Sequence, residues 1–268
     1  MATRKVRAAL IDLSGTIHVE DREVPGAIAA IQRLRDAGIG VRFATNTTKE
    51  SRRLLCKRLQ KIGFSIEERE IFTSLTAARQ FVVDRKLKPY LLVDDAALED
   101  FESFFPTDTD ADAADAVLVG LAPATFSFAN MNTAAQVLLR GCPLIAIHKA
   151  RYFMTQNGLS LGPGAFVSAL EFAATCEAVV VGKPQASFFR EAARELHCGT
   201  EECVVVGDDV RDDVIGAQSA GFQGILVKTG KFREGDEKGA DSACGHLQPD
   251  HVCESIVDAV DLIIRGME

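Results

Sequence analysis

The segment of this chain with the clearest capacity for chemistry is residues 12–16, with the sequence DLSGT. It directly follows a short apolar run at residues 8–11, which predicts a buried strand that ends at Asp12. Open α/β sheets bind ligands at the carboxyl ends of their strands, and an aspartate there can attack phosphorus and form an aspartyl-phosphate. The same residues are common in ordinary polar turns, so this segment alone leaves both interpretations open.

Two later strand ends carry side chains suited to binding a phosphoryl group. Thr45 and Asn46 follow an apolar run at residues 39–44, and Lys183 follows the β-branched residues 179–181. A hydroxyl and an amide can hydrogen-bond phosphoryl oxygens, and a lysine can neutralise their charge. These groups are the complement of a nucleophilic aspartate, so they favour a phosphate site.

A further apolar run, at residues 203–206, ends in a cluster of acidic residues at 208–213 that includes Asp208 and Asp213. Together with Asp12, such carboxylates would hold a hard divalent cation through oxygen ligands. Each of these strand ends is a weak signal alone. Their occurrence in this order, each after an apolar run, is a strong one.

The four segments resemble, in order, the motifs of the haloacid dehalogenase superfamily of phosphohydrolases, and the resemblance covers essentially the whole chain. Within the superfamily the likeness extends to four longer segments: TNTTKES (45–51), EIFTSLTAAR (70–79), PLIAIHKARY (143–152) and GILVKTGK (224–231). The resemblance implies a phosphatase that requires Mg²⁺ and acts on a small phosphorylated compound through an aspartyl-phosphate at Asp12.

The resemblance also implies a role for each matching residue. Asp12 matches the nucleophile, Thr45 the phosphate-binding hydroxyl with Asn46 beside it, and Lys183 the lysine that balances the charge. The expected site residues are: catalytic, Asp12, Ser14 and Lys183; substrate-binding, Asp12, Leu13, Ser14, Thr45, Asn46 and Lys183; and for the metal, Asp12, the backbone carbonyl of Ser14, Asp208 and Asp213.

Ser14 departs from the superfamily pattern, which has an aspartate at this position in most phosphatases. That aspartate protonates the leaving group, whereas a serine hydroxyl is a poor general acid near neutral pH. General acid–base catalysis contributes ~10²–10⁴-fold, so we expect slow turnover of substrates with poor leaving groups unless another group replaces the acid. His18 and the acidic residues 209–213 are candidates by proximity in sequence only.

The composition is that of a soluble enzyme. The chain has 268 residues, 47% of them hydrophobic, which is enough for one large core or two modest ones. The net charge of -8 argues against a general binder of nucleic acid or of anionic membranes. A basic run at residues 49–61 has helical spacing and is typical of a solvated helix face, with an anionic partner as the alternative.

The cysteines and the absence of long apolar stretches bear on location. The seven cysteines are scattered and odd in number, which suits free thiols in a reducing compartment. We find no signal peptide and no apolar stretch approaching the ~20 residues of a membrane span, so we expect a cytoplasmic protein. Cys244, His246, His251 and Cys253 are a possible zinc set, but their spacing fits no common zinc module.

The periodicity of apolar residues predicts how the first motifs are positioned. Residues 25–37 have helical spacing with Pro25 in the first turn and Gly38 just after the end. A second helix carries apolar residues from 54 to 62, and Thr47 with Glu50 resembles a capping box at its start. Alternation of strand and helix predicts a parallel sheet wound on both faces, a Rossmann-like fold.

Residues 78–180, between the second and third motifs, have strand-like runs at 90–93, 116–119 and 144–147 and helical patterns at 128–140 and 166–174. We expect an inserted α/β cap domain there, with the catalytic core formed by residues 1–77 and 181–268. In the superfamily such a cap selects the substrate, and cap-to-cap homodimers are frequent. Residues 148–152 (HKARY) follow a predicted strand and could face an anionic substrate or form a basic surface loop.

Two classes of function stay open at this point. The first is the magnesium-dependent small-molecule phosphatase. The second is a phosphate-ligand binder or regulatory protein that keeps the fold but has lost efficient chemistry at Ser14. Because a binder has no need for a nucleophile, the joint presence of Asp12, Thr45, Lys183 and Asp208 favours the enzyme.

Overall fold

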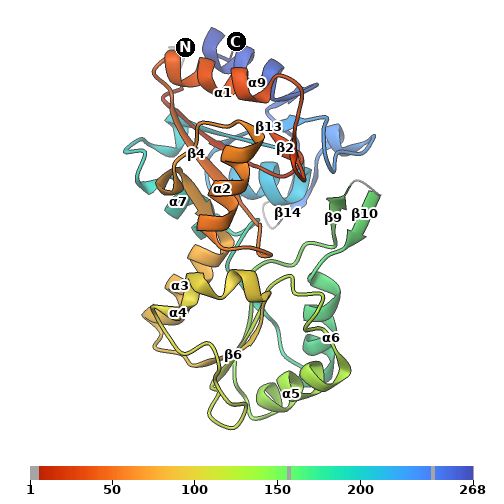
Figure 1. Ribbon diagram of the computed structural model, residues 1–268. Coiled ribbons are helices and arrows are strands. Elements are labelled where there is room, and N and C mark those ends of the chain that lie inside the picture. Colours follow the sequence, from red (N-terminus) through yellow and green to blue (C-terminus); the bar gives the residue numbers. More distant parts are fainter. Residues whose placement is uncertain (1–5, 156–157, 243–244, 268) are drawn as a thin grey trace.

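The computed structural model describes residues 6–155, 158–242 and 245–267. In this described part, the longest parallel sheet is formed by both ends of the chain, and a second parallel sheet is formed by its middle (Figure 1). Both chain termini lie on the same side of the molecule, near helices α1 (Ala27–Asp36) and α9 (Ile256–Arg265). An ion pair between Arg33 and Asp261 joins these two helices.

The first sheet contains the strand that ends at Asp12. In spatial order its strands are β16 (His251–Cys253), β13 (Gln223–Val227), β12 (Cys203–Gly207), β1 (Ala8–Ile11), β4 (Gly40–Thr45) and β5 (Ile71–Thr73). All neighbouring pairs are parallel, and Ile11 of β1 lies level with Val206 of β12 and Phe43 of β4. This register brings the carboxyl ends of the three strands to one edge.

Helices cover both faces of this sheet. The helices on one face are α1, α2 (Arg52–Ile62) and α9, and those on the other are α7 (Ala186–Arg194) and α8 (Gly216–Ser219). Successive side chains of a strand point to opposite faces, and in β1 Ala9 and Ile11 pack on the first group while Ala8 and Leu10 pack on the second. The continuous apolar run at residues 8–11 is what a strand buried on both faces requires.

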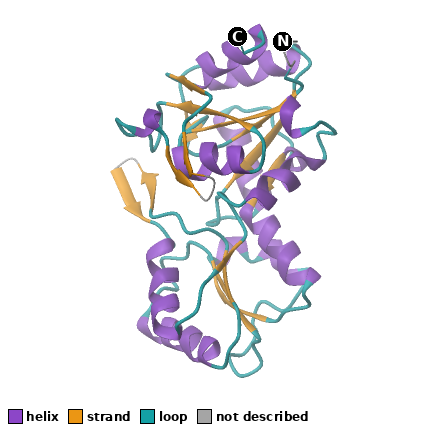
Figure 2. Cartoon of the chain, turned by 180° about the vertical axis from the view of Figure 1, so that it is seen from behind, coloured by secondary structure: helices purple, strands orange, loops and turns teal. Residues whose placement is uncertain are grey.

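The second sheet has the same construction. Its strand order is β11 (Val179–Val180), β8 (Leu144–Ala146), β7 (Ala116–Val119) and β6 (Pro89–Leu92), all parallel. The helices α3 (Ser74–Asp84) and α4 (Glu99–Glu102) cover one face, and α5 (Phe128–Leu139) and α6 (Gly164–Ala174) the other (Figure 2). Antiparallel hairpins are β2 (His18–Val19) with β3 (Arg22–Glu23), β9 (Tyr152–Thr155) with β10 (Gly158–Leu161), and β14 (Ala240–Ser242) with β15 (Gly245–Leu247).

The predicted doubly wound parallel sheet is confirmed. The expected boundary between residues 77 and 78 lies inside α3, whose buried Leu75 and Val82 pack with the second sheet. The division into core and cap at the stated residues therefore stays a prediction. None of the helices within the described ranges is both long and apolar enough to cross a membrane.

The predicted capping box at the start of α2 is wrong. The helix begins at Arg52, and its N-cap is the buried Ser51, whose Oγ accepts a hydrogen bond from the backbone N–H of Leu54 at 3.2 Å. Glu50 instead forms an ion pair with Arg58 at 2.6 Å. Thr47 does not cap the helix because it precedes Ser51 in the loop that follows β4, where its hydroxyl lies 2.9 Å from that of Thr45.

Candidate active site

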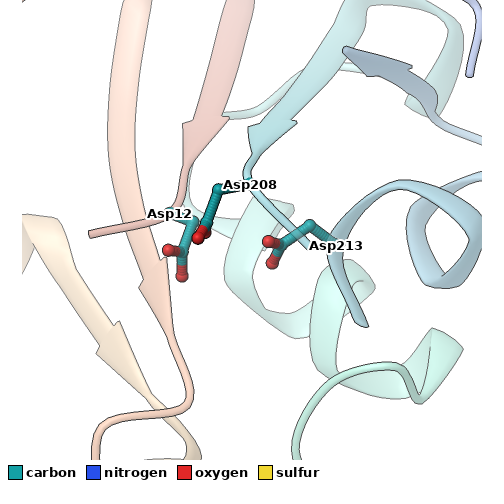
Figure 3. Close-up of side chains that lie close together, drawn as sticks. All are labelled: Asp12, Asp208 and Asp213. Carbon is teal, nitrogen blue, oxygen red and sulfur yellow. The ribbon is translucent and has the colours of Figure 1, made fainter. Parts of the chain in front are cut away.

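Three aspartates meet at the carboxyl edge of the first sheet (Figure 3). Asp12 follows β1, Asp208 follows β12, and Asp213 lies on the π-helical turn Val210–Ile215. Each offers an oxygen within 4.8 Å of the others, and all three are buried. The sequence predicted that these residues would come together: the parallel register of β1 and β12 brings Asp12 beside Asp208, and the π-helical turn that follows β12 carries Asp213.

Lys183 lies between two of these carboxylates. Its Nζ is 2.6 Å from Oδ1 of Asp12 and 2.6 Å from Oδ1 of Asp213, and its side chain is 2% exposed. Burial by itself would lower the pKa of Lys183, but Asp12 and Asp213 outweigh it and raise the pKa above its usual value. The lysine is therefore a fixed positive charge beside the predicted nucleophile.

Asp208 accepts hydrogen bonds from two loops, the one that follows β1 and the one that follows β13. Thr16 Oγ1 donates to its Oδ1 at 3.3 Å, and the backbone N–H of Lys231 donates to its Oδ2 at 2.6 Å. Gly15, with φ of +99°, leaves the space that Asp208 occupies, since a Cβ there would lie 2.1 Å from Oδ2. Burial raises the pKa of Asp208 well above its usual value, and the Asp12 and Asp213 carboxylates add to this effect although Lys231 opposes it.

The aspartate cluster fits a hard divalent cation. Burial also raises the pKa of Asp213, to about 6, and the neighbouring Asp12 carboxylate adds to the shift while Lys183 opposes it. Raised pKa values in a group of buried carboxylates mean that their negative charges are only partly balanced by the protein. Carboxylate oxygens are the ligands that Mg²⁺ prefers, so Asp12, Asp208 and Asp213 could hold this ion.

Thr45 and Asn46, predicted to bind phosphate, lie at the end of β4 and have different surroundings. Thr45 is buried, and its Oγ1 accepts the backbone N–H of Thr47 at 3.2 Å. The Asn46 amide makes two bonds to the backbone of Lys183: its Nδ2 donates to the carbonyl at 3.1 Å, and its Oδ1 accepts from the N–H at 3.0 Å. Asn46 therefore positions the lysine.

Leu13 and Ser14 belong to the loop that follows β1. The Leu13 side chain is buried in the apolar cluster that covers one sheet face, so its contribution to a phosphate site would come from its backbone. Ser14 is partly buried and faces the same cavity as Asp12. The metal ligand predicted here is the backbone carbonyl of Ser14, and its role stays a prediction.

A cavity of about 460 Å³ opens beside Asp12, which is a suitable size for a small phosphorylated compound. It is lined from the first sheet and its loops by Asp12, Ser14, His18, Glu20, Asp21, Thr45, Asn46, Thr47, Thr48, Lys49, Glu50, Arg58 and Lys231, and from the middle of the chain by Leu121, His148, Ala150, Tyr152, Phe153 and Thr155. A larger cavity of about 560 Å³ shares Ala150 and Tyr152 with it but does not reach Asp12. We therefore take the smaller cavity as the candidate active site.

His18, named above as a candidate proton donor, does not have the chemistry of one. Its Nδ1 lies 2.9 Å from the carbonyl oxygen of Glu20 and donates to it, so Nε2 carries the lone pair in the neutral ring. Nε2 is buried and has no hydrogen-bond partner within the described ranges. Burial and the nearby Arg58 lower the pKa of His18 to about 4, so the ring is neutral at physiological pH.

Residues 148–152 were predicted either to face an anionic substrate or to form a basic surface loop. In the structure, some of these residues line the cavity and others do not. His148 is buried and lines the cavity together with Tyr152. Lys149 is turned away and pairs with Glu171 of α6 at 2.8 Å. Next to this loop, Phe153 of β9 lies under the Lys49 ammonium at 4.0 Å, a cation–π contact that joins the two halves of the cavity wall.

Lys231 is a residue that sequence analysis did not select. Its Nζ is 3.3 Å from Oδ2 of Asp209, its backbone N–H binds Asp208, and it lines the cavity. It follows β13, the neighbour of β12 in the sheet. A signal was available, since Lys231 ends the segment GILVKTGK after an apolar run, but only the strand order shows that this run lies next to Asp208.

The possible zinc set receives no support from its members in the described ranges. Cys244 lies outside the described residues. Both ring nitrogens of His246 are hydrogen-bonded to protein, Nδ1 to Asp241 at 2.9 Å and Nε2 to the Lys238 carbonyl at 2.8 Å. Neither nitrogen of His246 is then available to a metal ion.

Comparison with known proteins gives the same family over both ends of the chain. A family described as haloacid dehalogenase-like hydrolase matches residues 9–104, and one described as HAD-hydrolase-like matches residues 180–259. The chain is 53% identical to haloacid dehalogenase-like hydrolase domain-containing protein 2 of Rattus norvegicus over 268 residues, which is 100% of both chains.

More distant matches extend to proteins named for their activity. The chain is 36% identical to phospholysine phosphohistidine inorganic pyrophosphate phosphatase of Xenopus laevis, over 98% of this chain and 96% of that protein. Among solved structures, p-nitrophenyl phosphatase from Archaeoglobus fulgidus matches with a TM-score of 0.86 and 28% identity, over 96% of this chain and 99% of that one.

Proposed function

The chain belongs to the haloacid dehalogenase-like hydrolases and is a phosphatase, and we propose that it hydrolyses small phosphorylated compounds with Mg²⁺ through an aspartyl-phosphate on Asp12. The observation that carries this proposal is the position of Lys183 between Asp12 and Asp213, 2.6 Å from each, beside a third buried carboxylate and an open cavity. An ion pair buried this deeply has little value for stability alone, which favours a catalytic purpose.

In the proposed first step, an oxygen of Asp12 attacks phosphorus and the bond to the leaving group breaks. Lys183 stays protonated and balances charge on the transferred phosphoryl group, and Asn46 holds its backbone in place. Thr45 offers a hydroxyl to a phosphoryl oxygen. Water then hydrolyses the aspartyl-phosphate and restores Asp12.

Mg²⁺ would be held by Asp12, Asp208, Asp213 and the Ser14 carbonyl, and would supply positive charge that neutralises phosphoryl oxygens. Thr16 orients two of these ligands, since its hydroxyl lies 3.4 Å from Oδ2 of Asp12 and 3.3 Å from Oδ1 of Asp208. Thr16 thereby helps to hold the negatively charged carboxylates of Asp12 and Asp208 close together.

The middle of the chain, residues 78–180 by our division, is proposed as a cap that selects the substrate. Its support is that this part contributes residues from Leu121 to Thr155 to the lining of the cavity that Asp12 also lines. Because Ser14 cannot act as an acid, we propose that the preferred substrates carry good leaving groups, such as aryl phosphates, acyl phosphates, phosphoramidates or pyrophosphate.

The proposal is tested by turnover of a panel of phosphorylated metabolites and aryl phosphates with the purified protein. We expect activity with Mg²⁺, its loss on thorough chelation, and a decrease of at least about 10³-fold in Asp12→Asn, because an amide is not a competent nucleophile. Asp36→Asn, at the exposed end of α1, is the matched control and should behave as wild type.

Equal turnover by wild type and Asp12→Asn would reject the nucleophile. Binding of phosphorylated ligands without turnover would instead support the alternative of a phosphate-binding or regulatory protein. Activity that survives complete removal of divalent ions would reject the role of Mg²⁺ while leaving that of Asp12 intact.

A further inference from the structure

We propose that the Nε2–H of His148 donates a hydrogen bond to the leaving group of the substrate. This hydrogen bond would partly compensate for the acid that is missing at Ser14. This inference rests on the proposed phosphatase function and adds to it a catalytic residue that comes from the cap. His148 is 5% exposed and lines the same cavity as Asp12, Ser14 and Lys231.

The hydrogen bonds of the ring assign its proton. The backbone N–H of Ala150 donates to Nδ1 of His148 at 3.3 Å, so Nδ1 must carry its lone pair. In a neutral imidazole the proton is then on Nε2, which makes this atom a donor. Burial and the positive charge of Lys231 lower the pKa of His148 to about 3, so the neutral donor is the form present at physiological pH.

His18 in the same cavity wall has the opposite arrangement, which makes the two histidines distinguishable. Its Nδ1–H is used on the Glu20 carbonyl, and its Nε2 is an acceptor. A phosphoryl group and a departing alkoxide or phenoxide have lone pairs and need donors. Among the residues that the structure describes, none accepts the Nε2–H of His148, so of the two rings only His148 has a donor to offer to such a leaving group.

The position of His148 is tied to the catalytic lysine through the backbone. The residue before it, Ile147, donates its N–H to the Val119 carbonyl at 2.8 Å, and its own carbonyl accepts the N–H of Gly182 at 2.8 Å. Gly182 directly precedes Lys183, and a Cβ at Gly182 would lie 2.5 Å from both the Ile147 carbonyl and Asn46 Oδ1. The cap loop that carries His148 therefore meets Asn46 and Lys183 at one tightly packed junction.

The proposed step, with the hydrogen bond from His148, needs no reactant other than the substrate and water. The bond from Asp12 to phosphorus forms as the bond from phosphorus to the leaving oxygen breaks, and that oxygen keeps the electron pair. The His148 Nε2–H stabilises the developing negative charge by a hydrogen bond and keeps its proton, because a neutral imidazole is not an acid at this pH. The leaving oxygen then takes its proton from water.

The test is a series of substituted aryl phosphates with leaving groups of different pKa, measured as kcat/KM with saturating Mg²⁺ for wild type, His148→Leu and His148→Gln. We expect His148→Leu to lose roughly 10- to 100-fold on the poorest leaving groups and much less on the best, so that the dependence on leaving-group pKa steepens. His148→Gln, whose amide can place a donor near the Nε2 position, should recover most of the loss.

Two controls separate this role from a structural one. His251→Leu, on β16 and outside the cavity, should leave the series unchanged. If His148→Leu does not fold, His148→Asn replaces it: its shorter amide falls short of the Nε2 position, so its dependence should be steeper than that of His148→Gln.

A uniform loss across the series in His148→Leu, or an unchanged slope, would overturn the proposal. These outcomes differ from failure of the phosphatase function itself, because that failure would appear as turnover insensitive to Asp12→Asn. If activity depends on Asp12 but the dependence of kcat/KM on leaving-group pKa is the same in wild type and His148→Leu, only the role of His148 is rejected.

Discussion

At the scale of single residues, Ser14 is the position from which we infer which phosphate bonds the site is suited to break. It lies beside the nucleophile and faces the cavity, but its hydroxyl holds its proton too tightly to act as an acid. His18, the nearest histidine in sequence, is a neutral ring with its proton on Nδ1. The loop after β1 therefore carries the proposed nucleophile Asp12, but neither Ser14 nor His18 is suited to act as a general acid.

Ser14→Asp should raise kcat/KM on alkyl phosphates, by up to ~10²-fold if general acid catalysis is recovered at the usual magnitude. Aryl phosphates with good leaving groups should gain little, because their departure needs no proton. The measurement is the same leaving-group series for both proteins at fixed pH and Mg²⁺. No gain on alkyl esters, with Mg²⁺ affinity unchanged, would mean that the acid at this position is not what limits the enzyme.

Burial of His18 predicts a stability that depends on pH. The pKa of His18 is about 4 in the folded protein and about 6.5 when unfolded, so the unfolded chain binds more protons between these values. The stabilisation by the neutral ring is therefore present above pH 6.5 and is lost as the pH falls toward 4. Between pH 7 and pH 5 the loss amounts to roughly 2 kcal/mol.

We expect His18→Asn, which keeps a donor for the Glu20 carbonyl but does not titrate, to gain that amount relative to wild type when the pH falls from 7 to 5. Urea unfolding of both proteins at the two pH values measures the difference. The buried Asp208 and Asp213 have raised pKa values and act with the opposite sign, but they are common to both proteins and cancel. A difference that does not change with pH would contradict the prediction.

At the scale of elements, the start of α2 links the two halves of the molecule. The Ser51 hydroxyl caps the helix and donates to Glu99 of α4 at 2.7 Å, and the backbone N–H of Arg52 donates to Asp100 at 3.1 Å. Acidic groups at a helix N-terminus are favourable because they meet its unpaired N–H groups and its partial positive charge. These contacts fix α2 against α4.

Ser51→Ala should lower the free energy of unfolding by roughly 1–2 kcal/mol, because it removes the cap of a buried helix start and a hydrogen bond to Glu99. Urea or thermal unfolding measures the effect. Arg53→Ala is the matched control, since it removes an exposed ion pair to the same Glu99 and should change stability little. Equal effects of the two variants would show that the cap is not the source of the stabilisation.

At the scale of the whole molecule, the active-site cavity is formed where the two sheets with their helices approach each other. Asp12, Ser14 and Lys231 come from one part, and His148, Tyr152 and Phe153 from the other. The cation–π contact of Lys49 with Phe153, and that of Arg233 with the Tyr152 ring at 4.6 Å, join the two parts. The homodimer through the cap stays a prediction.

Mg²⁺ should stabilise the folded protein, because the unfolded chain cannot gather three carboxylates around one ion. At a concentration 100-fold above the dissociation constant, we expect the melting temperature to rise by roughly 5 °C or more. Asp208→Ala should lose most of this shift because it removes a charged oxygen ligand, whereas Asp36→Ala should retain it. A shift that is equal in wild type and Asp208→Ala would place the bound ion elsewhere.

Local sequence patterns were sufficient to predict the buried strands and the polar residues that follow them. The apolar run at residues 8–11 and the one at 116–119 are observed as β1 and β7 with the predicted bounds, because a strand buried on both faces must be apolar throughout. The same local pattern predicted that Asp12 and Asp208 follow strands, whereas the pairing of β1 with β12 brings the two strand ends together. Such local signals depend only on residues that are adjacent in the chain.

How distant residues share the site depends on contacts that form only in the folded chain. Asn46 positions Lys183 from 137 residues away, Ser51 and not Thr47 caps α2, and the tautomer of His148 depends on a backbone N–H. Strand order brings Lys231 to Asp208, and burial keeps the rings of His18 and His148 neutral. These properties depend on neighbours in space and on the exclusion of water, which local spacing along the chain does not encode.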